Sequence, residues 1–121
     1  MDKKRILLVD DSDTILVLEK LMLGSDYSTM TAKNGRLALE TAGREKPDLI
    51  LMDIMMPEMD GIESLRAMRA REETKKIPII MVTTKSEKSR VETCYQLGCS
   101  DYINKPIDKV ELLSKVRKFL T

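Results

Sequence analysis

The chain has 121 residues, of which 42% are hydrophobic and 34% are charged, and its 21 Lys and Arg nearly balance its 20 Asp and Glu. This length fits one domain over residues 1–121, and the composition excludes a disordered or membrane-embedded chain. The net charge of +1 gives no basis for direct binding to nucleic acid. No apolar stretch is long enough to cross a membrane or to form a signal-peptide core, so we expect a cytoplasmic protein.

The content of His and Cys restricts the chemistry. There is no His, and Cys94 and Cys99 are not spaced as CxxC. This set excludes a tetrahedral zinc site of His and Cys ligands and the catalytic triads that need His. We expect two reduced, partly buried thiols. Any reaction must therefore use carboxylates, hydroxyls, lysines and a metal ion.

The first half of the chain alternates strand-like and helical segments. The apolar run 6–9 predicts a strand buried on both faces, and residues 27–32, which are mixed, suit an edge strand. Between them, Ser12 or Asp13 begins a helix that ends at Gly24. We expect its buried face to carry Ile15, Leu18, Leu21 and Met22. A second helix spans 35–45, where Gly43 weakens it and Pro47 stops it.

The second half continues the alternation. Residues 49–52 and 79–82 are again apolar runs, and 101–103 is a short edge strand. A third helix begins at Asp60 with Ile62, Leu65 and Met68 facing inward. A fourth spans 86–97, and its poor apolar stripe marks it as a candidate moving part. A fifth follows Asp108, and we expect it to bury Val110, Leu113, Val116 and Leu120.

The strict order of strand and helix predicts an α/β fold. Right-handed crossovers give an open, doubly wound parallel sheet with helices on both faces. Three apolar central strands and two weaker edges fit the order 2-1-3-4-5, which is taken over from known sheets of this kind. Ligands of such sheets bind outside the carboxyl ends of the strands, between the first and third.

Polar residues follow four of the strands at that edge: Asp10 and Asp11, Asp53, Thr83 and Thr84, and Lys105 and Pro106. Two carboxylates ~4 Å apart repel by roughly 4 kcal/mol at an effective dielectric near 20, and a divalent cation removes this conflict. Oxygen ligands favour Mg²⁺, Mn²⁺ or Ca²⁺ over softer metals, and we expect Mg²⁺ because it uses one or two carboxylates together with phosphate oxygens and waters. A carboxylate nucleophile with a nearby ammonium and hydroxyl suits phosphoryl transfer. Each motif alone is more often structural, but four separate elements meet at one edge.

Together these motifs resemble the receiver domain of response regulators, the CheY-like superfamily of two-component signal transduction. The matching segments are 8–12 (LVDDS), 53–61 (DIMMPEMDG), 82–84 (VTT) and 101–106 (DYINKP), and the resemblance covers the whole chain. It implies a flavodoxin-like sheet of five strands with five helices. It also implies Mg²⁺-dependent acceptance of a phosphoryl group from a sensor histidine kinase or a histidine phosphotransfer protein.

The resemblance also implies a role for each matching position. Asp53 would be the phosphoacceptor. Asp11 would bind the metal directly together with Asp53, while Asp10 would bind mainly through water and Met55 through its backbone carbonyl. Lys105 would pair with the phosphoryl group, and its bond to Pro106 is a candidate cis peptide.

Further positions would serve switching and tuning. Thr83 would hydrogen-bond the phosphoryl group, and Tyr102 would change rotamer with it. The face of the fourth helix, fifth strand and fifth helix would then change its binding to an unknown downstream target. Met55 and Lys85 would flank the path of attacking water, and Thr84 would restrict access of the donor.

Two other functions are alternatives to this signalling module, which would catalyse only its own phosphorylation and dephosphorylation. One is a phosphorylation-independent interaction domain. The other, an aspartyl-phosphate phosphatase, is disfavoured because Asp10 and Asp11 are adjacent rather than two apart, and because no cap domain is inserted. The chain is either a stand-alone regulator or part of a longer one. It is a monomer or a phosphorylation-dependent dimer through Asp101, Glu111 and Arg117.

Overall fold

The computed structural model describes residues 2–120 of the chain. The strands are β1 (Lys4–Val9), β2 (Tyr27–Ala32), β3 (Leu49–Asp53), β4 (Ile79–Thr83) and β5 (Asp101–Asn104). The α-helices are α1 (Asp13–Leu23), α2 (Gly35–Glu45), α3 (Gly61–Arg69), α4 (Val91–Gln96) and α5 (Lys109–Leu120). Two short 3₁₀ helices, η1 (Gly24–Asp26) and η2 (Lys85–Arg90), precede β2 and α4.

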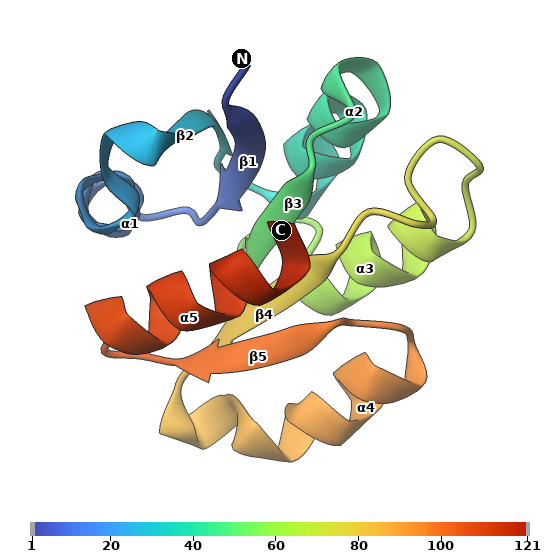
Figure 1. The fold of residues 1–121 in the computed structure, drawn as a ribbon. Helices are drawn as coiled ribbons and strands as arrows, with labels where there is room; N and C mark the ends of the chain where they lie inside the picture. Colours follow the sequence, from blue (N-terminus) through green and yellow to red (C-terminus); the bar gives the residue numbers. More distant parts are fainter. Residues whose placement is uncertain (1, 121) are drawn as a thin grey trace.

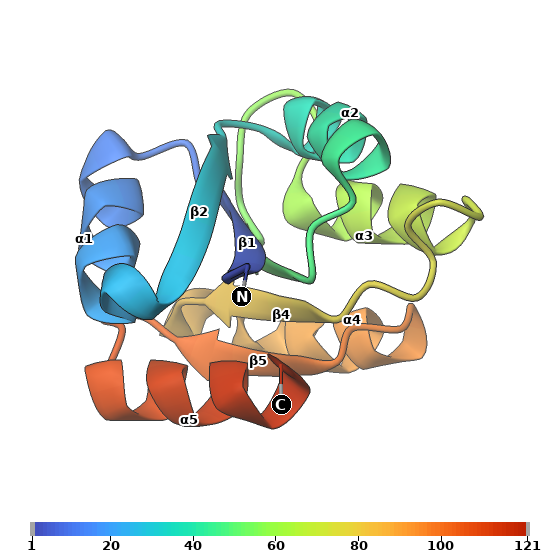
Figure 2. The ribbon, with the colours of Figure 1, turned by 45° about the horizontal axis from the view of Figure 1, so that its top comes forward.

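The five strands form one parallel sheet in the order β2-β1-β3-β4-β5. Helices α1 and α5 cover one face, and α2, α3 and α4 cover the other (Figures 1 and 2). The predicted strand order and the edge positions of β2 and β5 are therefore confirmed. Every residue of β3 and β4 is buried, as expected for central strands with apolar runs. Within residues 2–120, no helix is long and apolar enough to span a membrane.

Each face of the sheet has its own apolar core. Because successive strand residues point to opposite faces, the two cores take alternate residues of each strand. The α1–α5 core contains Ile6, Leu8, Leu51, Val82 and Ile103 from the strands. The α2–α4 core contains Leu7, Val9, Ile50, Met52 and Met81 from the strands. The two buried cysteines, Cys94 and Cys99, are free thiols in the α2–α4 core.

The helix starts follow the expected capping chemistry. Ser12, rather than Asp13, caps α1, and its Oγ accepts a hydrogen bond from the Ile15 amide at 3.3 Å. Asp60 caps α3, where its carboxylate accepts from the Glu63 amide at 2.9 Å and the Glu63 carboxylate accepts from the Asp60 amide at 3.2 Å. The sequence identified both helix starts correctly, and α3 buries Leu65 and Met68 as predicted.

The predicted buried face of α1 is partly wrong. Leu21 is 71% exposed and Leu18 is 37% exposed, while the buried residues are Leu16, Glu19 and Leu23. Seven of the eleven positions of this helix are apolar and they occur on several sides, so periodicity does not determine which side faces the sheet. The structure turns Glu19, the residue least suited to burial, toward the core.

Two corrections concern the later helices. In α5, Val110 is 76% exposed, whereas Leu112 and Val116 form the buried stripe, four residues apart. The predicted helix 86–97 is divided into η2 and the shorter α4. At the start of η2 the buried Glu87 carboxylate accepts a hydrogen bond from the Thr84 amide at 2.9 Å, which caps this segment.

Two glycines give a direct test of the packing around β3. A Cβ atom at Gly61 would lie 2.0 Å from the Asp53 carbonyl oxygen, whereas a Cβ at Gly43, inside α2, meets nothing within 4 Å. We expect Gly61→Ala to lower the free energy of unfolding by roughly 3 kcal/mol through overpacking. Gly43→Ala should raise it by about 0.5–1 kcal/mol. Urea unfolding measures both, and equal effects would contradict the close approach at Gly61.

Candidate functional site

Strand register brings three charged residues together at the carboxyl edge of the sheet. Val9 lies opposite Met52 in the parallel pairing of β1 with β3, so Asp10 and Asp53 follow at equivalent positions. Leu8, Leu51 and Ile103 face the α1–α5 core. Asp10, Asp53 and Lys105 each come two residues later and point to the same side.

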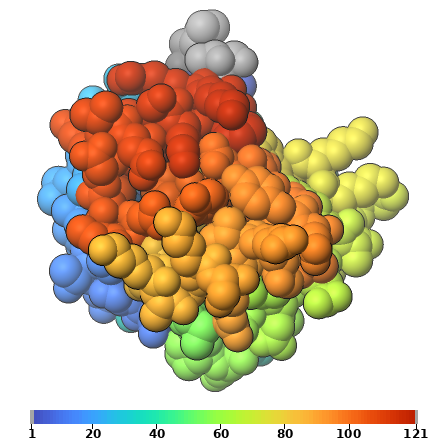
Figure 3. Space-filling model, turned by 90° about the horizontal axis from the view of Figure 1, so that it is seen from below, coloured from blue at the N-terminus to red at the C-terminus, as the bar shows by residue number. Residues whose placement is uncertain are grey.

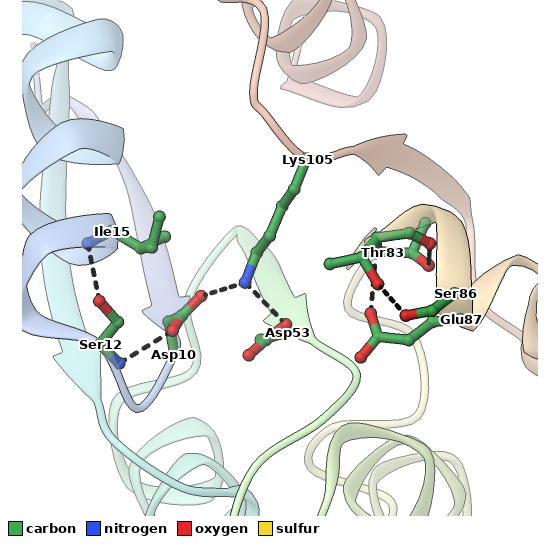
Figure 4. A network of polar contacts seen from close by, with 9 residues as sticks. Asp10, Ser12, Ile15, Asp53, Thr83, Ser86, Glu87 and Lys105 are labelled. Carbon is green, nitrogen blue, oxygen red and sulfur yellow. Dashed lines mark hydrogen bonds and ion pairs between the residues drawn. The ribbon is translucent and has the colours of Figure 1, made fainter.

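Lys105 joins the two buried carboxylates. Its Nζ lies 3.1 Å from Asp10 Oδ2 and 3.1 Å from Asp53 Oδ1, as Figure 4 shows. Asp10 is 1% exposed and Asp53 is 3% exposed. The Ser12 amide donates to the other Asp10 oxygen at 2.9 Å, so that carboxylate is held from two sides. One Asp53 oxygen is thus bonded to Lys105, and the other is available for chemistry.

The acidic cluster fits a hard divalent cation. Asp10, Asp11 and Asp53 each offer a carboxylate oxygen, and these atoms lie within 4.8 Å of one another. Asp11 is exposed and gives the cluster a solvent-facing side. One ammonium does not balance three carboxylates, and oxygen donors of this kind suit Mg²⁺. The donor set is therefore consistent with a magnesium site.

The electrostatics of the site show the same imbalance. Burial, followed by the Asp10 charge, raises the pKa of Asp53 to about 6 despite the opposing effect of Lys105. Burial alone would lower the pKa of Lys105, but the charges of Asp53 and Asp10 and their hydrogen bonds outweigh it, and the pKa lies above its usual value. Lys105 therefore stays charged near neutral pH.

Thr83 belongs to the opposite face of the sheet. Its neighbour Val82 points into the α1–α5 core, so the Thr83 side chain, which is fully buried, points toward the α2–α4 side. Its hydroxyl donates to the Thr84 carbonyl oxygen at 3.0 Å. In Figure 4, Asp53 lies between Asp10 and Thr83. The site therefore draws its groups from both faces.

Tyr102 shares the Thr83 face and lies against α4 and α5. It is opposite Met81 in the pairing of β4 with β5, and it packs against the α2–α4 core. Its ring meets Tyr95 edge-on, with centroids 6.3 Å apart, and Lys115 Nζ lies 5.1 Å from the ring centroid. The ring is half-buried at the surface formed by α4, β5 and α5, which Figure 3 shows from outside.

The three charges considered for a dimer contact differ in their surroundings. Lys115 pairs with Asp101 at 3.4 Å and with Glu111 at 3.8 Å within the chain. Arg117 is exposed. Two of the three charges are therefore already engaged in the single chain.

The remaining predicted positions lie around the edge of the site. Met55 is 51% exposed, and its Sδ accepts a hydrogen bond from Arg90 Nη1 at 3.0 Å. The Thr84 hydroxyl lies 2.9 Å from the Ser86 hydroxyl, and Lys85 is exposed. The peptide bond between Lys105 and Pro106 is cis.

Sequence reasoning missed Glu19. This α1 residue is 1% exposed, and its Oε1 has no hydrogen-bond partner among residues 2–120. Burial raises the pKa of Glu19 to about 8, the Asp10 charge contributes to the rise, and Lys105 opposes it. The only sequence signal is one acid within a strongly apolar helix, which is more often a solvated position.

The chain belongs to the response regulator receiver domain family, whose family model matches residues 6–117. It is 36% identical to the polar-differentiation response regulator DivK of Brucella anthropi, over 97% of this chain and 96% of that protein. It is 38% identical to protein PilH of Pseudomonas aeruginosa, over 96% of this chain and 97% of that protein.

Other relatives are longer. The chain is 39% identical to the transcriptional regulatory protein PhoP of Bacillus subtilis over 97% of its own length, but it spans only 48% of PhoP. It spans 29% of a protein-glutamate methylesterase of Nocardioides, at 50% identity over 84% of its own length. Receiver domains of this family thus occur both nearly alone and with other domains.

Solved receiver structures superpose closely. The chemotaxis protein CheY4 of Vibrio cholerae has a TM-score of 0.90 at 30% identity, covering 98% of this chain and 99% of that one. The receiver domain of the histidine kinase PA1611 of Pseudomonas aeruginosa has a TM-score of 0.89 at 33% identity, covering 98% of each chain. That kinase receiver has a magnesium ion coordinated in its active-site cleft.

The buried Glu19 makes stability depend on pH. Because its pKa rises from 4.5 to about 8 on folding, the folded protein keeps a proton that the unfolded chain releases. The associated stability is fully present below about pH 4.5 and is lost progressively as pH rises to about 8. Between about pH 5 and pH 9, we expect the free energy of unfolding of the wild type to fall by about 4 kcal/mol more than that of Glu19→Gln. Urea unfolding measures the difference.

The matched control is Glu40→Gln, which changes an exposed glutamate on α2. Its pH dependence should follow that of the wild type. A wild-type slope in Glu19→Gln would show that Glu19 titrates normally.

Proposed function

We propose that the chain is a single receiver domain that accepts a phosphoryl group on Asp53, with Mg²⁺ bound beside it. The donor would be a histidine kinase or a histidine phosphotransfer protein. The observation that supports this most is the Lys105 ammonium, which is bonded to both buried carboxylates next to the acidic cluster. The phosphorylated domain would signal to a downstream target through the face of α4, β5 and α5.

Asp53 has the geometry of a nucleophile. Lys105 holds one of its oxygens, and the second oxygen would attack phosphorus. An oxygen–phosphorus bond forms to Asp53, and the bond from phosphorus to the donor breaks, leaving its electron pair on the donor. The Lys105 ammonium would stay with the transferred group and offset its charge.

Asp10, Asp11 and Asp53, with the Met55 carbonyl, would hold the magnesium ion. When bound, the ion supplies the positive charge that these carboxylates and the phosphoryl oxygens require. Met55, Thr84 and Lys85 would tune donor access and the lifetime of the acyl phosphate.

Thr83 would carry the signal away from the site. Its hydroxyl donates to the Thr84 carbonyl, and it must leave that acceptor to reach a phosphoryl oxygen. Tyr102 packs on the same face of the sheet, between α4 and α5. A rotation of the Thr83 side chain toward the phosphoryl group would therefore change the space available to the Tyr102 ring.

The phosphoacceptor is tested by incubating the wild type, Asp53→Asn and Asp13→Asn with acetyl phosphate and Mg²⁺. We expect intact-protein mass spectrometry to find one added phosphoryl group on the wild type and on Asp13→Asn. The Asp13 variant is the control, because it changes an exposed carboxylate on the surface. Asp53→Asn should gain none, because its amide is not a nucleophile. Equal labelling of Asp53→Asn would overturn the assignment.

Two other results would redirect the proposal. A folded wild type that takes no phosphoryl group would favour the interaction domain that works without phosphorylation. Turnover of a free phosphate ester would favour the phosphatase.

Metal binding is tested separately by thermal unfolding. We expect Mg²⁺ at about ten times its Kd to stabilise the wild type by roughly 1.4 kcal/mol, because the ion relieves repulsion among three carboxylates. Asp11→Asn should lose most of this shift, whereas Asp13→Asn, a neighbouring acid that pairs with Lys33 at 2.9 Å, should keep it. A full shift in Asp11→Asn would exclude Asp11 as a ligand.

A further inference from the structure

Arg90 makes a long-range contact beside the phosphorylation site. It is the last residue of η2, and its Nη1 donates to Met55 Sδ at 3.0 Å. Met55 lies two residues after Asp53, in the segment between β3 and α3. The contact therefore connects the segment after β3 with the segment after β4. These are the segments that follow Asp53 and Thr83.

The guanidinium is oriented by a second group. The Asp60 carboxylate uses Oδ1 to cap α3, and its Oδ2 lies 4.0 Å from Arg90 Nη1. Because Asp60 is fixed by its reciprocal bonds with Glu63, it offers a fixed negative charge to Arg90. Arg90 is thus held between the start of α3 and the start of α4.

Met55 is a flexible side chain that Arg90 contacts at its sulfur. Its side chain is 51% exposed, and an unbranched thioether with three rotatable bonds is mobile when it is not held. Arg90 provides a directional donor to its sulfur. In Figure 3 the surface of η2, coloured gold, borders the green surface of the chain after β3.

We propose that Arg90 is a positioning residue that holds Met55 beside Asp53 and so prolongs the lifetime of the acyl phosphate. This rests on the proposed function. A fixed apolar side chain next to the phosphorus excludes water that would attack in line with the bond to Asp53. A mobile Met55 leaves that path open for part of the time. The contacts of Arg90 are with Met55 and Asp60, so its effect on the acyl phosphate would pass through Met55.

The test compares the first-order loss of the phosphoryl group from the wild type, Arg90→Ala, Met55→Leu and Arg90→Ala/Met55→Leu after removal of acetyl phosphate. Leu keeps the apolar volume at position 55 but removes the sulfur acceptor. We expect each single variant to shorten the lifetime about fivefold, the size expected for one exposed polar contact. The double variant should be no faster than either single one, because both remove the same contact.

The matched control is Lys88→Ala, which removes an exposed cation from the same 3₁₀ helix. It should keep the wild-type lifetime, and thermal unfolding should show that all variants are folded. Equal shortening in Lys88→Ala would mean that general charge, rather than the position of Met55, sets the lifetime. Wild-type lifetimes in Arg90→Ala or Met55→Leu, or additive effects in the double variant, would also overturn the inference.

The same experiment separates this inference from the proposed function. If the wild type takes no phosphoryl group, the proposed function fails. If the wild type is labelled and the Arg90 and Met55 variants release the group at its rate, only the role of Arg90 fails.

Discussion

The Lys105 ammonium between Asp10 and Asp53 is the interaction on which the rest of the site depends. Two carboxylates buried side by side are costly, and removing their cation would leave uncompensated charge at the ends of β1 and β3. Lys105 follows β5. Its side chain reaches past the end of β4 to contact Asp53 at the end of β3 and Asp10 just after β1. One side chain thereby ties the edge of the sheet to its centre, across 95 residues of sequence.

The two faces of the sheet have different parts in the site. The α1–α5 side carries the charged groups Asp10, Asp53 and Lys105, and Glu19 adds a buried acid from α1. The α2–α4 side carries the hydroxyl of Thr83 and the aromatic ring of Tyr102. The charged side chains of the site therefore lie on one side of the sheet, and the hydroxyl and the aromatic ring lie on the other.

The strands and the location of the site were predicted well from the sequence. Apolar runs identify buried parallel strands, and the residues that follow parallel strands meet at the same edge of the sheet. It failed where several faces are equally apolar, as in α1, whose periodicity does not choose between Leu16 and Leu21. Glu19 was missed for the same reason. The contact of Arg90 with Met55 has no sequence signal, since it depends on two flexible side chains that are 35 residues apart. The division of the fourth helix into η2 and α4 was also missed, because the apolar pattern of residues 86–97 does not distinguish a 3₁₀ helix from an α-helix.

The placement of Asp53 and Thr83 on opposite faces has a mechanical consequence. A ligand that binds Lys105 and Thr83 together clamps the two layers across the edge of the sheet. The sheet is a stiff plate here, because every residue of β3 and β4 is buried and packed on both sides. Displacement would therefore be taken up at the rim of the sheet, where α4 is short and follows a 3₁₀ helix, rather than in β3 and β4.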